Sequence, residues 1–404
     1  MGARERILLI SLVIVALVVG VVSGYYAPRP TQFTTLTTQI YQTTTSVATV
    51  TEYVTTPTLV TTPLTKTYVL TTSLEWPRRV VDALGRVVVI QTPPSRIVST
   101  APSITETLVS LGLIARIVGV DSYSNYPPGI RDMVKTGRIE DVGGPWNLDI
   151  EKIIRLKPDI VFMCKGVSPQ ERSFAPKLEE SGVKTFFLLC DTARDQRDIY
   201  ADIRTVALIA GVESSAERLI RDIDANISRV TTALSKANAT SYRTLLLLGP
   251  PSWGLWTGGG NTFTSWLIRS AGGSNIADKY YGWGQLSYEE VLSADPEVIV
   301  VVVSHGVNAS VLKSDFENTP LTKTTAWRNG RVYLITGSYA DAILRPGPRI
   351  AVALEVLARV LHPEVFGEVK IPEVVRVLSV ERFSVELSET QILCLSRVLS
   401  VEVV

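Results

Sequence analysis

The chain has 404 residues, with 40 lysines and arginines against 39 aspartates and glutamates, and its formal net charge at pH 7 is +1. Near-balanced charge is not the electrostatic footprint of a nucleic-acid-binding protein, so we expect no nucleic acid among its partners. A chain of this length can form two ordinary domains with extensions. Its two histidines, His305 and His362, have no spacing typical of a metal motif or a catalytic triad, so we expect no enzymatic activity and no resident cofactor.

The N-terminal region, residues 1–27, has the pattern of a signal peptide or a membrane anchor. Arg4 and Arg6 precede an apolar stretch over residues 7–22, which is marginal in length because a bilayer needs roughly 17–25 apolar residues. No cysteine lies near this stretch, so a lipid anchor on an N-terminal cysteine is excluded. The basic N-terminus favours the inside for that end, and we therefore expect an extracytoplasmic protein tethered to the membrane by its N-terminal segment.

Residues 28–74 form a Thr-rich segment that also contains Pro57 and Pro63. Such a composition supplies no core, so we expect an extended stalk that is open to O-glycosylation, and the alternative is a β-rich Thr segment that packs. Three Asn-X-Ser/Thr sequons further along the chain agree with a glycoprotein at the cell surface, and they begin at Asn226, Asn238 and Asn308.

From residue 75 onward the chain alternates predicted strands and helices, which is typical of an α/β fold. We expect two Rossmann-like α/β lobes, residues 75–193 and residues 241–365, joined by a long helical connector over residues 194–240. Residues 366–404 alternate Val and Glu in the manner of strands, but no turn chemistry separates them, and we assign this extension no role.

Two local patterns in the first lobe predict specific contacts. Ser103 and Glu106 have the spacing of a capping box at the start of a helix. Cys164 and Cys190 each end an apolar, strand-like run, and in a parallel sheet those two ends would lie at one edge. A disulfide between them is therefore geometrically possible, and two buried free thiols are the alternative.

One fifteen-residue pattern occurs twice, over residues 149–163 and 287–301. In each copy a helix-capping Asp or Ser is followed two residues later by Glu, then by a short apolar-periodic helix, a Pro, an acidic residue and a β-branched strand. Trp146 or Trp283 precedes each copy by a few residues. Two matching units far apart indicate two similar lobes, each with an aromatic residue and a surface acid in the same place.

The chain resembles the cobalamin and iron-siderophore substrate-binding proteins of ABC importers over about residues 80–365. The motifs that carry this resemblance occur in consistent order, and they are Arg96–Val120, Tyr123-Ser-Asn-Tyr126-Pro-Pro, Trp146, Asn147-Leu148, Leu156-Lys-Pro-Asp159, Trp256-Thr-Gly-Gly, Ala271-Gly-Gly-Ser-Asn275-Ile, the second repeat, Trp327-Arg-Asn-Gly-Arg-Val-Tyr333 and Pro346-Gly-Pro-Arg349. The resemblance implies two α/β lobes joined by one long helix, with the ligand in the cleft between them.

The resemblance also implies a membrane partner. In the family a surface Glu at the start of the helix after the Trp of each lobe contacts arginines of the ABC permease, and Glu151 and Glu289 occupy these positions. Two carboxylates on two lobes suit a two-fold symmetric permease dimer, and their charge would help to steer docking.

The ligand implied by the resemblance is a large chelate, most strongly a corrinoid such as cobalamin, because vitamin B12-binding members line their cleft with aromatic side chains. Flat aromatic faces suit a planar macrocycle, and a carboxylate in the cleft can accept hydrogen bonds from its amides. The matching positions are Tyr123, Tyr126, Trp146, Trp256, Trp283, Tyr339 and Asp341.

Three alternatives stay open. An iron-siderophore or haem binder of the same family would use cationic side chains for an anionic chelate, and Lys165, Arg345 and Arg349 are candidates. His305 follows an apolar run and is a lone candidate for a metal ligand, although metal sites need several converging ligands. A structural or adhesion protein on a stalk belongs to a different class, but repeated β-domains, which would favour it, are not evident in the sequence.

Overall fold

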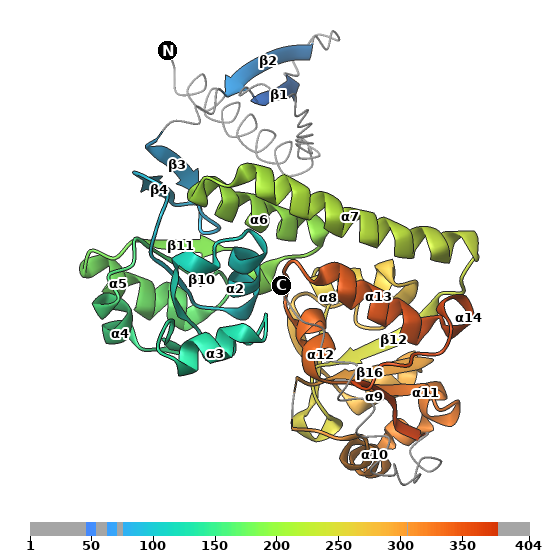
Figure 1. The fold of residues 1–404 in the computed structure, drawn as a ribbon. Helices are drawn as coiled ribbons and strands as arrows, with labels where there is room; N and C mark the ends of the chain where they lie inside the picture. The colour runs from blue at the N-terminus through green and yellow to red at the C-terminus, as the bar shows by residue number, and fades with distance from the viewer. Residues whose placement is uncertain (1–45, 54–62, 71–75, 305, 379–404) are drawn as a thin grey trace, which may run out of the picture. The chain divides into compact units, whose positions relative to one another are not determined.

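The computed structural model describes residues 46–53, 63–70, 76–304 and 306–378 (Figure 1). The chain divides between Trp76 and Pro77 into two compact units. The predicted anchor therefore lies outside the described residues, as does His305. In the part of the chain that is described, no helix combines the length and apolarity needed to cross a membrane.

The first unit contains a β-hairpin in the segment expected to be an extended stalk. Strand β1 (Ser46–Tyr53) pairs antiparallel with β2 (Pro63–Leu70), from Ser46 opposite Leu70 to Tyr53 opposite Pro63. An extended stalk was expected here, and the structure shows that two of its stretches pair as a hairpin. Thr is β-branched and favours strands, so a Thr-rich sequence that cannot fill a core can still pair its backbone.

The second unit begins with the N-terminal lobe, which is built on a five-stranded parallel sheet in the order β11-β10-β5-β6-β7. A two-stranded antiparallel hairpin, β3–β4, precedes the sheet, and a short one, β8–β9, lies within the lobe. The strands are β3 (Arg78–Val81), β4 (Val87–Ile90), β5 (Ile97–Ser99), β6 (Ile117–Val120), β7 (Glu140–Asp141), β8 (Gly143–Gly144), β9 (Asn147–Leu148), β10 (Ile160–Cys164) and β11 (Thr185–Leu188). The helices are α2 (Pro102–Ser110), α3 (Gly129–Lys135), α4 (Ile150–Arg155) and α5 (Ala175–Glu180).

Two helices form the connector between the lobes, α6 (Gln196–Ala210) and α7 (Glu213–Lys236). Gly211 separates them with a φ of 71°, a left-handed conformation that glycine adopts without a steric penalty. A buried apolar stripe on α7, which includes Ile220, Ile223 and Ile227, has the 3.6-residue period of a helix that packs on one side. Helix α7 contacts α6, the other helix of the connector, and also α13, which belongs to the second lobe. Figure 1 shows α7 running over both lobes.

The C-terminal lobe has a five-stranded sheet in the order β14-β12-β16-β17-β18, in which only the edge strand β18 runs antiparallel. Its strands are β12 (Tyr242–Leu247), β13 (Leu255–Gly258), β14 (Gly273–Asn275), β15 (Trp283–Leu286), β16 (Val298–Val302), β17 (Val332–Ile335) and β18 (Val374–Arg376). The helices are α8 (Phe263–Ser270), α9 (Tyr288–Ala294), α10 (Ala309–Glu317), α11 (Thr325–Arg328), α12 (Gly337–Leu344), α13 (Ile350–Leu361) and α14 (Pro363–Phe366). Strand β18 extends this lobe beyond residue 365, where the sequence placed its end.

The predicted repeat is present in both lobes with matching hydrogen bonds. Helices α4 and α9 are capped by Asp149 and Ser287, and Ser287 forms a capping box with Glu290. After the Pro of each copy, Asp159 or Glu297 accepts a backbone N–H from the neighbouring strand's start, at 2.8 Å from Arg96 N and 2.9 Å from Arg243 N.

The strand order is also shared between the lobes. The run β11-β10-β5-β6 of the first sheet corresponds to β17-β16-β12-β14 of the second. In the first sheet the repeat strand β10 pairs with β5, which follows Arg96, the partner of Asp159. In the second sheet the repeat strand β16 pairs with β12, which contains Arg243, the partner of Glu297. The two lobes are therefore built on one plan, as the repeat predicted.

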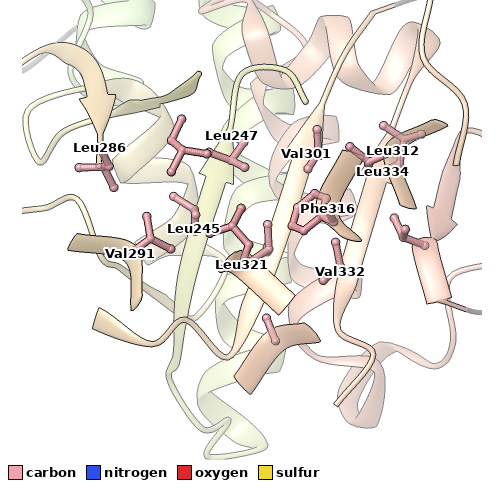
Figure 2. Packing of buried hydrophobic residues seen from close by; sticks show 14 of the residues in the cluster. Leu245, Leu247, Leu286, Val291, Val301, Leu312, Phe316, Leu321, Val332 and Leu334 are labelled. Carbon is pink, nitrogen blue, oxygen red and sulfur yellow. The ribbon is translucent and has the colours of Figure 1, made fainter. Parts of the chain in front are cut away.

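An apolar cluster of the C-terminal lobe joins one face of the sheet to α9, α10 and the turn after α10 (Figure 2). Leu245, Val301 and Leu334 come from three adjacent strands, and Phe316 from α10 is fully buried against them. The ring of Phe316 also stacks on Trp327, with 5.7 Å between centroids and an interplanar angle of 11°. This packing fixes the sheet whose carboxyl end faces the other lobe.

We expect Phe316→Ala to lower the free energy of unfolding by about 3–5 kcal/mol, because it leaves a cavity in a close-packed cluster. Val311→Ala on the same helix is the control, since Val311 is 56% exposed, and it should change stability by about 0.5 kcal/mol or less. Urea unfolding followed by circular dichroism measures both. Equal losses in the two variants would contradict the packing described for α10.

Candidate functional site

A cavity of about 390 Å³ lies between the two lobes of the second unit. It is lined by loops that follow the carboxyl ends of β5, β6, β10 and β11 in the first lobe, and of β16 and β17 in the second. In open parallel sheets, ligands bind outside the carboxyl ends of the strands. The volume lies within the range of small-molecule sites, so this cavity is the candidate ligand site.

Three of the residues that the sequence singled out for the ligand line this cavity. Tyr123 lies in the loop after β6, and Trp146 lies at the turn between β8 and β9. Both are exposed, with 52% and 62% of their surface open. Asp341, on α12, lines the cavity from the second lobe and is buried. The cavity therefore brings together two aromatic faces and one carboxyl group.

Two further predicted residues lie on the hairpin β13–β15. The register pairs Trp256 with Gln285 and Gly258 with Trp283, so Trp256 and Trp283 share one face of the hairpin. The indole Nε1 of Trp283 donates to the backbone oxygen of Asp191 at 3.2 Å. Neither Trp256 nor Trp283 is part of the cavity lining, and both are exposed, but Trp283 contacts Asp191, which does line the cavity.

The remaining two predicted residues, Tyr126 and Tyr339, do not line the cavity either. The guanidinium of Arg349 lies 4.1 Å from the ring centroid of Tyr126, so one face of that ring already has a cationic partner. Tyr339 is half-buried on α12. The ligand-binding role of the whole predicted set stays a prediction.

Glu106 does not form the predicted capping box. Helix α2 begins at Pro102, so Ser103 lies inside the helix, and the cap position is Ala101, which has no side-chain acceptor. Glu106 is instead buried and faces the second lobe, where its carboxylate pairs with Arg345 at 2.9 Å and with Arg349 at 2.6 Å. The capping-box prediction is wrong because the local spacing contains no information about these distant partners.

A second set of bonds across the cavity floor centres on Arg345. It donates to Asn125 Oδ1 at 2.7 Å and to the backbone oxygen of Tyr123 at 3.2 Å. It also pairs with Asp341 at 2.9 Å, and Asp341 in turn accepts from Asn125 Nδ2 at 2.9 Å. Asn125 was not singled out from the sequence, and its place in the Tyr123–Tyr126 loop was the only signal that pointed to it.

Cys164 and Cys190 form a disulfide, the first of the two alternatives left open by the sequence. Cys164 ends β10 and lines the cavity. Its backbone N–H donates to Gln170 Oε1 at 2.8 Å, and Gln170 Nε2 donates to Pro145 O at 3.1 Å. The buried Gln170 thereby joins two cavity-lining loops, and no pattern in the sequence indicated this role.

Two carboxyl groups near the cavity have raised pKa values because the surrounding protein excludes water from them. Burial raises the pKa of Asp121 to about 6, although Ser124 and the backbone N–H of Tyr123 donate to its carboxylate and oppose the shift. Desolvation likewise raises the pKa of Asp191 to about 6. Asp191 lines the cavity. Its side chain is therefore exposed by surface area, yet protein atoms on the cavity walls surround its carboxyl group and raise its pKa.

The two predicted docking residues occupy equivalent places. Glu151 and Glu289 are each the second residue of their helix, α4 and α9, and both are exposed. Glu151 has one loose ion pair, to Arg155 at 3.9 Å. The adjacent Glu290 differs, because its carboxylate accepts from Tyr280 and Ser287, and these bonds lower its pKa to about 2. Glu289 is therefore the acid of this pair of glutamates that is available to a partner.

The model of the periplasmic binding protein family matches residues 97–339, more than half of the chain, and the chain belongs to this family. An uncharacterized ABC transporter substrate-binding lipoprotein of Bacillus subtilis is 25% identical over 293 residues, which cover 72% of this chain and 88% of the relative. A vitamin B12-binding protein of Pectobacterium carotovorum is 27% identical over 263 residues, covering 65% and 86%.

Solved structures share the fold. The crystal structure of a periplasmic heme binding protein from Pseudomonas aeruginosa matches with a TM-score of 0.60 at 24% identity, over 70% of this chain and 97% of that one. The predicted α/β fold with two lobes is thereby confirmed, as is the resemblance to substrate-binding proteins of ABC importers. Members of this family bind solutes. In the described residues no group of three or more His, Cys, Asp or Glu side chains is placed to hold a metal ion.

We expect the stability of the protein to depend on pH through Asp121. Its pKa is about 6 in the folded chain against an ordinary value of 3.8, so between these values the folded state keeps a proton that the unfolded state releases. The stabilisation from this proton is fully present below the ordinary pKa and is lost as the pH rises through the folded pKa. The free energy of unfolding relative to Asp121→Asn should fall by about 3 kcal/mol at most between about pH 4 and pH 7.

Denaturant unfolding at a series of pH values measures this difference. Asp132→Asn is the control, because Asp132 is an exposed carboxylate on α3 of the same lobe. The difference in the free energy of unfolding between wild type and Asp132→Asn should not show the fall between about pH 4 and pH 7 that is expected against Asp121→Asn. A wild-type stability that rises against Asp121→Asn over the same range would contradict the assigned shift.

Proposed function

We propose that the chain is the extracytoplasmic substrate-binding protein of an ABC importer, and that it captures a corrinoid such as cobalamin and delivers it to the permease. The observation that carries this proposal is the cavity between two similar lobes, lined by Tyr123 and Trp146 and by the carboxyl group of Asp341. Aromatic faces bury the flat ring of a corrinoid, and its peripheral amides can donate to a carboxylate.

The charge of the cavity supports a corrinoid over an anionic chelate. Arg345 and Arg349, which the sequence offered as partners for an anion, are held by Glu106, and Arg345 is also held by Asp341. Lys165 is not part of the lining, whereas Arg345, Asp191 and Asp341 are, and Arg345 and Asp341 pair with each other. A ligand with free carboxylates would therefore meet the carboxyl group of Asp191 and find no uncompensated cation among these residues, which is unfavourable in a partly desolvated site. Haem and ferric siderophores remain the alternative class for this family.

The proposed location is outside the cytoplasm, tethered by the N-terminal segment. The relative in Bacillus subtilis is named a lipoprotein. This chain has cysteines only at positions 164, 190 and 394, so its tether would be the apolar stretch over residues 7–22 and not an acyl chain on a nearby cysteine. A disulfide between Cys164 and Cys190 is consistent with an oxidising compartment.

We expect Trp146→Ala combined with Trp283→Ala to weaken cobalamin binding. Each aromatic face that is lost removes roughly 1 kcal/mol beyond its buried area, so Kd should rise on the order of tenfold or more. Titration of the protein with cyanocobalamin, haemin and a ferric siderophore, followed by absorbance, measures the affinities. The matched control, Trp146→Phe with Trp283→Phe, keeps flat rings and should retain most of the affinity. Unchanged cobalamin affinity in the double Ala variant would remove the stacking model.

The proposed partner is an ABC permease dimer that contacts one exposed glutamate on each lobe. We expect Glu151→Ala combined with Glu289→Ala to leave ligand affinity unchanged and to impair uptake, because exposed carboxylates at an interface mainly steer and orient docking. Glu180→Ala with Glu317→Ala is the control, since it also removes one exposed acid from each lobe. Uptake of labelled ligand by cells or vesicles that contain the importer is the measurement. Normal uptake by the Glu151 and Glu289 variant would end the docking assignment.

A further inference from the structure

The two lobes are joined at the floor of the cavity by a buried cluster of charges. Glu106 comes from α2 of the first lobe, while Arg345 and Arg349 come from the segment between α12 and α13 of the second. Their side chains are only 2%, 11% and 10% exposed. With Asp341 the cluster holds two carboxylates and two guanidinium groups, so its charges compensate each other away from water.

The geometry of the cluster is that of strong, directed contacts. Arg349 binds Glu106 with two parallel bonds, from Nε at 2.8 Å and Nη2 at 2.6 Å, and Arg345 adds a third from Nη1 at 2.9 Å. Charge-assisted and bidentate bonds of this kind are roughly twice as strong as neutral ones. The lobes also touch beside the connector, but there the bonds are neutral and longer, at 3.2 Å for Trp283 to Asp191 and 3.2 Å for Phe263 to Ala193.

We propose that Glu106 is a positioning residue that latches the two lobes together before a ligand arrives. The connector α6–α7 lies at one side of the lobes, and it does not by itself fix the distance across the cavity. The latch fixes this distance, because any widening of the cavity separates Glu106 from both arginines and leaves a buried charge unpaired. Arg345 also holds Asn125 and the Tyr123 backbone, so the same latch places the cavity lining of both lobes.

The latch has a consequence for binding. If the cavity is already formed without ligand, nearly all molecules are ready to bind. The ligand affinity is then not reduced, as it would be if only a small fraction of molecules had the cavity formed. Loss of the latch would then lower affinity without removing any group that touches the ligand. For this affinity readout the inference rests on the proposed binding function, whereas the distance between the lobes can be measured without any ligand.

The test is a distance measurement on the full chain. Spin labels are placed at Lys177→Cys on α5 and Glu317→Cys on α10, two exposed positions in different lobes, in a Cys394→Ser background with the disulfide intact. Double electron–electron resonance should give one narrow distance distribution for the wild-type latch, with or without cyanocobalamin. Glu106→Gln should broaden the ligand-free distribution towards longer distances, and cyanocobalamin should narrow it again. The Kd of Glu106→Gln for cyanocobalamin should rise about tenfold if the fraction of molecules with the lobes held together falls to about a tenth.

Two further variants keep the proposal open to refutation. Arg345→Gln leaves the Glu106–Arg349 pair in place, so it should fold even if Glu106→Gln does not, and should broaden the distribution less. Glu179→Gln is the control, because Glu179 pairs with Arg86 inside the first lobe, and its distribution should match the wild type.

Wild-type distributions in both Glu106→Gln and Arg345→Gln, or equal broadening in Glu179→Gln, would overturn the latch. A wild-type protein that binds none of cyanocobalamin, haemin and a ferric siderophore would end the proposed function. The distances measured without ligand would still decide on the latch.

Discussion

The binding cleft depends on the buried carboxylate of Glu106, which the second lobe holds with two guanidinium groups. A buried charge is tolerated only when it is paired and hydrogen-bonded, and removing one partner is strongly unfavourable. The arrangement of the lobes in which Glu106 meets Arg345 and Arg349 therefore has few competitors of similar energy. Because Arg345 also binds Asn125 and Asp341, the loops that line the cavity are fixed by the contact that fixes the lobes.

The duplicated plan explains why a cavity forms between the lobes at all. In each lobe the acid after the Pro ties the repeat strand to the start of its neighbour, as Asp159 does with Arg96 and Glu297 with Arg243. This sets the register at the amino ends of the parallel strands and leaves the carboxyl ends free to end in loops. Two sheets of the same order, with their carboxyl ends at one gap, bring all of these loops to the same place.

Much of this architecture could be predicted because its signals are local. The repeat, the connector that breaks at Gly211 and the alternation of strands and helices follow from caps, Pro positions and apolar periods. Contacts between distant residues have no such signal. Glu106 lies 239 residues from Arg345, and its spacing from Ser103 fits a capping box equally well. The pairing of β1 with β2 was not expected within the stalk, and the strand-like pattern that contains β18 could not be joined to the second lobe, since strand pairing is decided by partners and not by composition.

The same ion cluster bears on the choice of ligand. Basic residues near a cleft suggest an anionic ligand when only the sequence is known, and Arg345 and Arg349 fit that expectation by position. The structure assigns both guanidinium groups to internal carboxylates, so their charge is already compensated. What the cavity then offers a ligand is the flat surfaces of Tyr123 and Trp146 and the carboxyl group of Asp191, while the carboxylate of Asp341 is compensated by Arg345. For the proposed function, such a lining would select for a large apolar face that carries hydrogen-bond donors at its edge, because stacking contributes affinity while the carboxylate of Asp191 rejects acids of the same charge.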